Sequence, residues 1–194
     1  MYVRDAKNRE EVWLLDHIEA MGLDDTAFRS RDYVLAIDEE SHEKAGFGRI
    51  RIHKTDDGEF CELTSIGVLE EWEGQGVGAH VIERLVEYAA DESFDVVYSL
   101  TNAADYLVQF GFEPIDPAQL PDRLRERLTE KQEQLQPDAV PLRLQVDRFR
   151  MPGELRDRFK QASVDDQATS EPEEGPEDFG IDPEEATYKY DTGR

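Results

Sequence analysis

The feature of this sequence that most limits its fold is a glycine-dense turn in the segment GVLEEWEGQGVGAHVIERLVEYAA, residues 67–90. After the turn the apolar residues take up the period of a helix, with Val77, Val81 and Leu85 on one face. Glycines let backbone N–H groups come close to a ligand, and the first turn of a helix adds unpaired N–H donors and the positive end of its dipole. The pattern therefore predicts a strand, a turn that holds phosphate, and a helix over 77–90.

Two other kinds of phosphate-binding turn fit the surrounding residues less well. The letters G-x-G-x-x-A of a dinucleotide-binding turn occur at Gly74, Gly76 and Ala79, but a polar bridge, EEWE, separates them from the strand. The acidic residue that such a turn needs at the end of the next strand is also misplaced, because Asp91 and Asp95 precede that strand's core. A P-loop is excluded, since no Gly-Lys-Ser/Thr follows. Glycines that only make a tight turn remain the structural alternative.

Outside this segment the sequence predicts a mixed α/β (α+β) domain. Strands are expected at residues 2–6, 33–38, 46–53, 59–69, 94–100 and 140–146, and helices at 8–22, 77–90, 101–110, 121–135 and 153–160. A turn at Asp57-Gly58 would join two of the strands as a hairpin.

The helical patterns also predict which side chains are buried and where the domain ends. His80 is expected to face water. In the first helix the residues expected to face inward are Val12, Leu15, Ile18 and Met21. The domain is predicted to cover residues 1–163. Residues 164–194 are rich in Pro, Gly and acidic side chains, and we expect them to form a disordered acidic tail.

The charge of the chain excludes some classes of partner. A formal net charge of −24 argues against binding to nucleic acid or to an anionic membrane, because both need a basic surface. The excess is typical of adaptation to high salt, where the Debye length falls to about 3 Å at 1 M and self-repulsion is screened. A mesophilic, that is non-halophilic, protein with an acidic tail is the alternative.

Several absences in the sequence complete the class of protein that we expect. No apolar run is long enough to span a membrane, and the N-terminus lacks the layout of a signal peptide. We therefore expect a soluble, cytoplasmic protein that is a monomer or a homodimer. Cys61 is the single cysteine, and the four histidines share no metal-like spacing, so neither a disulfide nor a metal site is expected.

The layout strand, V-x-x-E-x-x-G-x-G-x-G, helix resembles the acetyl-CoA-binding motif of the GNAT superfamily of N-acetyltransferases. Val68 falls at the strand-end valine, Gly76 and Gly78 fill the two glycine positions, and Glu73 stands where the family usually has Gln or Arg. A second signature, a helix entering Gly-Phe, matches ADYLVQFGF, residues 104–112. The resemblance implies the GNAT acyl-CoA N-acyltransferase fold, a mixed and mostly antiparallel sheet with a splayed central strand and flanking helices.

A narrower resemblance is to the acetyltransferase domain of N-acetylglutamate synthases and related amino-acid acetyltransferases. The segments that carry it are CELTSIGV (61–68), SLTNAADYLVQFGF (99–112) and EPIDPAQLP (113–121). It implies a small amine or an amino acid as the acceptor. GNAT likeness as a whole covers about residues 2–150.

The resemblance also implies a site and a reaction. Acetyl-CoA would be the cosubstrate, and its acetyl group would pass directly to the acceptor amine. Glu62, six residues before Val68, would be the general base. Tyr106 would be the general acid, one position before Leu107, which occupies the family's tyrosine position. The residues implied in coenzyme binding are Ile66, Gly67, Val68, Glu73, Gly74, Gln75, Gly76, Val77, Gly78, Ala79 and Asn102.

Other readings stay open at this stage. A GNAT-fold module that binds acetyl-CoA as a regulator, without turnover, is the alternative function. A nucleophilic Cys61 is the alternative mechanism, and Asn102 could cap its helix instead of touching the coenzyme. Arg49 and Arg51 share a strand face and could clamp a substrate carboxylate, although a solvated sheet face is the simpler reading. Strand alternation is expected to put Glu62, Thr64, Ile66 and Val68 on one face.

Overall fold

The computed structural model describes residues 1–162. In chain order its helices and strands are β1 (Tyr2–Asp5), α1 (Glu11–Ala20), β2 (Tyr33–Ile37), β3 (Lys44–Thr55), β4 (Gly58–Val68), α2 (Val77–Asp91), β5 (Val96–Thr101), α3 (Ala104–Val108), β6 (Glu113–Pro114), α4 (Asp122–Gln134), β7 (Val140–Gln145) and α5 (Gly153–Gln161). The order agrees with the sequence prediction. The tail predicted at 164–194 lies outside the described residues.

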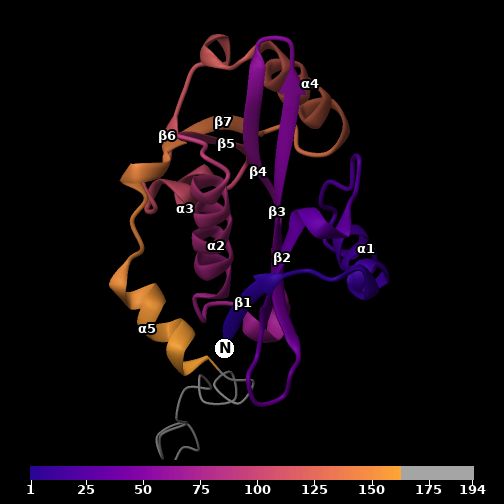
Figure 1. Ribbon diagram of the computed structural model, residues 1–194, viewed down its shortest axis with the longest axis vertical. Helices are drawn as coiled ribbons and strands as arrows, with labels where there is room; N and C mark the ends of the chain where they lie inside the picture. The colour runs from indigo at the N-terminus through magenta and orange to yellow at the C-terminus, as the bar shows by residue number, and fades with distance from the viewer. Residues whose placement is uncertain (163–194) are drawn as a thin grey trace, which may run out of the picture. The chain divides into compact units, whose positions relative to one another are not determined.

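The strands form one sheet with the order β1-β2-β3-β4-β5-β7-β6, in which β4 and β5 are parallel and every other pair is antiparallel. Helices α1 and α2 cover opposite faces of this sheet, and α4 lies on the side of α1 (Figure 1). Alternate residues of β2 accordingly enter two separate apolar cores, one under α2 and one under α1. The predicted mixed, mostly antiparallel sheet with flanking helices is confirmed.

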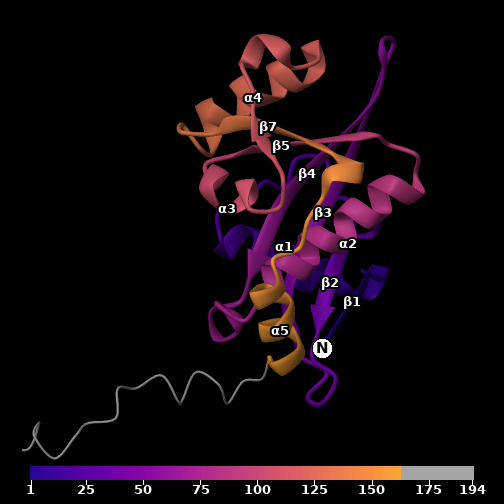
Figure 2. The ribbon, with the colours of Figure 1, turned by 90° about the vertical axis from the view of Figure 1, so that its left-hand side faces the viewer.

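The two central strands pair over only part of their length. β4 meets β5 at Cys61–Leu63, opposite Val97–Ser99, and beyond this point β5 continues along β7 while β4 continues along β3. Figure 2 shows the two strands running apart. From Thr64 to Val68, β4 therefore has no ladder partner on the side of β5 within the described chain, and the expected splay is present.

A β-bulge in β4 lies next to the splay. Between the pairs Phe47–Gly67 and Arg49–Thr64, β4 holds one residue more than β3, and Ser65 takes a left-handed φ of 49°. An extra residue inverts the alternation of side chains beyond it.

The bulge overturns the prediction that Glu62, Thr64, Ile66 and Val68 share one face. Ile66 and Val68 pack against the core under α2, whereas Glu62 and Thr64 point to the side of α1 and α4. Gly67, the next residue in the inverted pattern, faces the α1 core.

Two further predictions about side-chain direction are wrong. Val12, predicted to face inward, is 70% exposed, and α1 buries Leu14 where Leu15 was expected. Ile18 is buried and Met21 packs against the α1 core, as predicted. His80 does not face open water, since its ring stacks on Phe159 of α5. Burial, and then the nearby Arg156, lower the pKa of His80 to about 4.

No helix within residues 1–162 is long and apolar enough to cross a bilayer.

The bulge yields a test of the fold. Ser65→Val should lower the free energy of unfolding by about 1–3 kcal/mol, because a β-branched residue is strained at a left-handed φ. Ser65→Gly should cost less, since glycine accepts this φ and only the hydrogen bond from the Ser65 hydroxyl to the Asp24 carbonyl (2.6 Å) is lost. Denaturant unfolding of both variants measures the difference, and equal stability of Val and Gly at this position would contradict the strained bulge.

Candidate active site

A cavity of about 280 Å³ lies where β4 and β5 separate. Its walls come from the loop after α1, from both splayed strands, and from α2, α3 and α4. Apolar side chains such as Leu63, Ile66 and Ile82 line much of it, and the buried Asp24 and Lys131 bring opposite charges to its lining. A mainly apolar cavity with a few placed polar groups is what a small-molecule site requires.

The residues predicted to bind coenzyme divide into two groups. Ile66, Val68, Gly78 and Asn102 line the cavity. The others, with the exception of Gly67, form the glycine turn and the start of α2. A Cβ added at Gly78 would stand 3.2 Å from the Tyr106 hydroxyl and 3.3 Å from Val68, so a side chain here would crowd two other residues of the cavity lining.

The glycine turn has the features of an anion site. Gly74 and Gly76 have φ of 73° and 76°, and the first hydrogen bond of α2 runs from the His80 N–H to the Gly76 carbonyl (3.2 Å). The N–H groups of Val77, Gly78 and Ala79 thus have no acceptor within the helix.

No acidic side chain stands in the first turn of α2, a place where carboxylates are favoured, although 46 of the 194 residues are Asp or Glu. Together with the splayed edge of β4 and the cavity that Gly78 helps to line, the turn fits an acyl-coenzyme A that runs from the turn to the splay.

Gly76 also has a neighbour within the protein that the sequence did not predict. A Cβ at this position would collide with the carbonyl of Leu155 in α5, so the glycine leaves room for a helix of the protein. Gly74, with no atom within 4 Å of an added Cβ, and Glu73 are both exposed. Gln75, Val77 and Ala79 are buried, the latter two in the core under α2.

Tyr106 and Leu107 both line the cavity, and Tyr106 is the one that has a hydroxyl. Leu107 also reaches the cavity but belongs to the apolar core. Burial raises the pKa of the Tyr106 phenol, which therefore keeps its proton at neutral pH, as a general acid must. Asn102 does not cap α3, because the N-cap residue of this helix is Ala103 and no side chain caps it.

Glu62 lies beneath the site, and its carboxylate has no exposed surface. Its Oε2 is 2.7 Å from Nε2 of His53 and 3.6 Å from Nε of Arg127, while Oε1 has no hydrogen-bond partner in the described chain. Glu62 does not line the cavity; the carboxylate on the wall is that of Asp24, which pairs with Arg127.

Sequence reasoning missed Asp24, Arg127 and Lys131. Both cations belong to the buried stripe of α4, at the helical spacing that Leu124 and Leu128 also follow. A charge inside an apolar stripe was a signal in the sequence, because it has to find a buried partner. Asp24 sits in a loop, and no pattern marks it.

Lys131 is the less compensated of these charges. Its ammonium donates a hydrogen bond to the Leu100 carbonyl at 2.6 Å, and it has no ion pair within residues 1–162. Burial lowers its pKa to about 8, against the attraction of Glu62. A carboxylate in the cavity would offset this cost.

Three residues considered from the sequence, Arg49, Arg51 and Cys61, do not line the cavity. Arg49 is buried and donates hydrogen bonds to the carbonyls of Thr26 (2.7 Å) and Ala27 (2.5 Å), so it holds the loop after α1 and is not a substrate clamp. Arg51 lines a separate groove at the edge of β3 and has no ion pair in the described chain. Cys61 is fully buried under α2, and burial raises its pKa to about 12. Within residues 1–162, no group of three or more His, Cys, Asp and Glu could hold a metal ion.

Comparison with solved structures places this arrangement among known proteins. N-acetylglutamate synthase from Neisseria gonorrhoeae, complexed with coenzyme A and N-acetyl-glutamate, matches with a TM-score of 0.60 at 14% identity, over 75% of this chain and 35% of that one. Rv2747 from Mycobacterium tuberculosis, in complex with CoA, matches with a TM-score of 0.60 at 14% identity, over 74% and 98%. A GNAT-family acetyltransferase from Staphylococcus aureus Mu50 gives 0.55 at 12% identity, over 75% and 98%.

The chain thus spans about a third of the length of that N-acetylglutamate synthase, and at these identities the likeness shows a shared fold. The family model described as "Acetyltransferase (GNAT) family" matches residues 2–112, more than half of the 194 residues, and it includes the splayed strand, the glycine turn and Tyr106. The chain belongs to the acetyltransferase (GNAT) family.

Proposed function

We propose that this protein transfers the acetyl group of acetyl-CoA directly to the primary amine of a small acceptor, and that the acceptor is an amino acid. The observation that carries the proposal is the cavity at the β4–β5 splay. Its lining holds the opposite charges of Asp24 and Lys131, and Gly78, at the start of α2 and next to the glycine turn, is part of the same lining. An acceptor with both an amine and a carboxylate complements those charges.

The coenzyme half of the site would be made largely of backbone. The unpaired edge of β4 at Ile66–Val68 would hold the pantetheine arm, and the N–H groups of residues 75–79 would hold the diphosphate. Bound acetyl-CoA supplies the activated thioester carbonyl. Donors fixed along β4 would stabilise the charge that develops on its oxygen, and the rigid strands would align the two reactants.

The acceptor half would be made of side chains. Lys131 would bind the carboxylate of the amino acid, which restores the electrostatic stabilisation that burial removes from its ammonium. The N-acetylglutamate synthase that shares this fold was solved with N-acetyl-glutamate, in agreement with an acidic or neutral amino acid as the acceptor class.

Proton transfer completes the proposal. We assign Tyr106, which lines the cavity, as the general acid that protonates the leaving thiolate. Glu62, behind the cavity wall with an Oε1 that has no hydrogen-bond partner in the described chain, is our candidate for the general base, and Asp24 in the wall is the alternative. An α-amino group with a pKa near 8 is already about one tenth neutral at pH 7. The main task of the base is therefore to accept the proton that the nitrogen still carries after it has attacked the carbonyl.

The acceptor assignment is tested by a screen for acetyl-CoA-dependent release of CoA with amines and amino acids, in molar KCl because of the net charge of −24. Amino acids should outperform amines that lack a carboxylate. Lys131→Met, which keeps the aliphatic stem, should raise KM for the amino acid about tenfold or more and shift Tm by a few degrees at most. Equal rates with and without a carboxylate would contradict the assignment, and binding of acetyl-CoA with no turnover for any amine would favour the regulatory module.

The charge state of Lys131 gives a pH dependence. With a pKa of about 8, its ammonium is present below pH 8 and is lost as the pH rises. Affinity for N-acetyl-glutamate, which has carboxylates and no ionisable amine, should therefore fall above pH 8 in the wild type. In Lys131→Met the affinity should be low and flat over the same range. Calorimetry from pH 6.5 to 9.5 measures both.

The role of Glu62 is tested by Glu62→Gln. The variant should lose at least about tenfold in kcat/KM and the acidic limb of its pH profile, with the Kd for acetyl-CoA unchanged. Glu59→Gln, at an exposed position of the same strand, is the matched control. Asp24→Asn examines the carboxylate that lines the cavity. If Asp24→Asn and not Glu62→Gln shows this pattern, Asp24 is the base and our assignment of Glu62 is wrong.

Direct transfer predicts that Cys61 takes no part in the reaction. At pH 8 a thiol with a pKa of about 12 is ionised to about one part in ten thousand, so iodoacetamide should not inactivate the native enzyme. Cys61→Ala should retain kcat within about twofold. Rapid inactivation together with an inactive Cys61→Ala would point instead to an acyl-enzyme.

A further inference from the structure

Helix α5 is docked on the glycine turn. The ring of Phe159 stacks on that of His80 in the first turn of α2, with centroids 3.8 Å apart and 17° between the planes. The carbonyl of Leu155 lies against Gly76. Both views of the fold show α5 beside the N-terminal end of α2 (Figures 1 and 2).

This docking brings positive charge to the turn. Nη1 of Arg158 donates a hydrogen bond to the Gly74 carbonyl at 3.3 Å, and its side chain is exposed. Arg156, also on α5, forms an ion pair with Glu83 at 2.9 Å, so its charge is already paired. Arg158 has no ion pair within residues 1–162, so the rest of its guanidinium is available to an anion beside the turn.

The turn has no cation of its own. Between residues 55 and 83 the sequence contains no Lys or Arg, and Glu70, Glu71 and Glu73 lie just before the first glycine. Backbone N–H groups alone would face the phosphates of coenzyme A next to these three carboxylates. A bound phosphate therefore needs a positive charge from another part of the chain.

We propose that α5 completes the coenzyme site and that Arg158 binds the diphosphate of acetyl-CoA. Arg158 would thus take the place of the Gln or Arg that the family usually has at position 73, where this chain has a glutamate. The inference rests on the proposed function, since it takes acetyl-CoA as the ligand of the turn. A guanidinium can bind a phosphate through two parallel N–H groups, and this geometry suits a residue held at one point by the Gly74 carbonyl.

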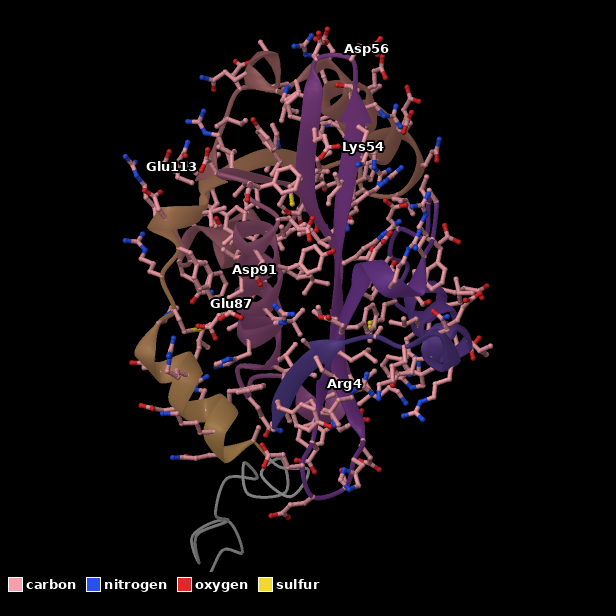
Figure 3. The ribbon with its side chains drawn as sticks, viewed as in Figure 1. Arg4, Lys54, Asp56, Glu87, Asp91 and Glu113 are labelled. Atoms are coloured by element: carbon pink, nitrogen blue, oxygen red, sulfur yellow. The ribbon has the colours of Figure 1, made fainter. Side chains whose placement is uncertain are left out.

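The test is calorimetric titration of the full chain with acetyl-CoA, at one KCl concentration for all variants. Arg158→Ala should raise Kd about tenfold to a hundredfold, the loss expected for a hydrogen bond between charged groups. Lys54→Ala is the control for net charge, because it removes one cation from the β3–β4 hairpin, far from α5 in Figure 3, and should leave Kd unchanged. Equal losses in the two variants, or no loss in Arg158→Ala, would overturn the proposal.

Truncated ligands define which part of the coenzyme Arg158 binds. For 3′-dephospho-CoA, the Kd should rise from wild type to Arg158→Ala by the same factor as for acetyl-CoA. If the Kd rises only for the ligand that carries the 3′-phosphate, Arg158 contacts that phosphate and the diphosphate assignment is overturned. Acetyl-pantetheine, which lacks the nucleotide phosphates, should be used by wild type and variant with the same kcat/KM. If the wild-type protein binds no acetyl-CoA at all, the proposed function fails, and that outcome is separate from a failure of Arg158 alone.

A second variant separates docking from charge. Phe159→Ala removes the stack on His80 and should weaken acetyl-CoA binding about as much as Arg158→Ala, because the arginine is no longer held at the turn. The double variant should then bind no more weakly than either single variant, which is the non-additivity expected of two residues that act as one unit. If the losses in affinity of the two single variants add up in the double variant, docking of α5 does not act by placing Arg158 at the turn, and this part of the proposal is overturned.

Discussion

The separation of β4 from β5 after Leu63 and Ser99 is the constraint on which the rest of this structure depends. In an intact sheet the edge of β4 from Thr64 to Val68 would be paired, and its backbone groups would be consumed. Beyond this point β4 pairs only with β3, and β5 pairs only with β7. The gap therefore lies inside the sheet, and neither strand is left without a partner. The bulge at Ser65 then turns Ile66 and Val68 toward α2, where they form an apolar wall.

The opposite side of the gap is organised by charge. Glu62, Asp24, Arg127 and Lys131 are all buried, and the contacts of Arg127 with both carboxylates join β4, the loop after α1 and α4 around one point. Removing one member of such a set leaves its partner buried and unpaired, which costs far more than the net gain from the pair. Lys131 has no ion pair within the described chain and lines the cavity, so the carboxylate of a ligand can offset the cost of burying its charge.

Much of this could be predicted from the sequence, and what could not has identifiable causes. The glycine turn, the amphipathic α2 and the Gly-Phe signature are local patterns, and they gave the fold and the positions of Gly78, Val68 and Tyr106. The facing of Ile66 was wrong because a single extra residue in β4 inverts the alternation, and a bulge at Ser65 leaves no periodic trace. The contact between Gly76 and Leu155 could not be predicted, because it joins residues that are distant in sequence. Arg127 and Lys131 stood in a visible stripe, yet their partners depend on tertiary structure.

Arg49 holds the loop after α1 through the carbonyl oxygens of Thr26 and Ala27, not through their side chains. The Ser65 hydroxyl does the same at the carbonyl of Asp24. These backbone anchors hold the part of the loop that lines the cavity, Gly22, Leu23 and Asp24, in place. Exposed positions of the loop that do not line the cavity, such as Asp25 and Thr26, can therefore drift during evolution without moving that wall.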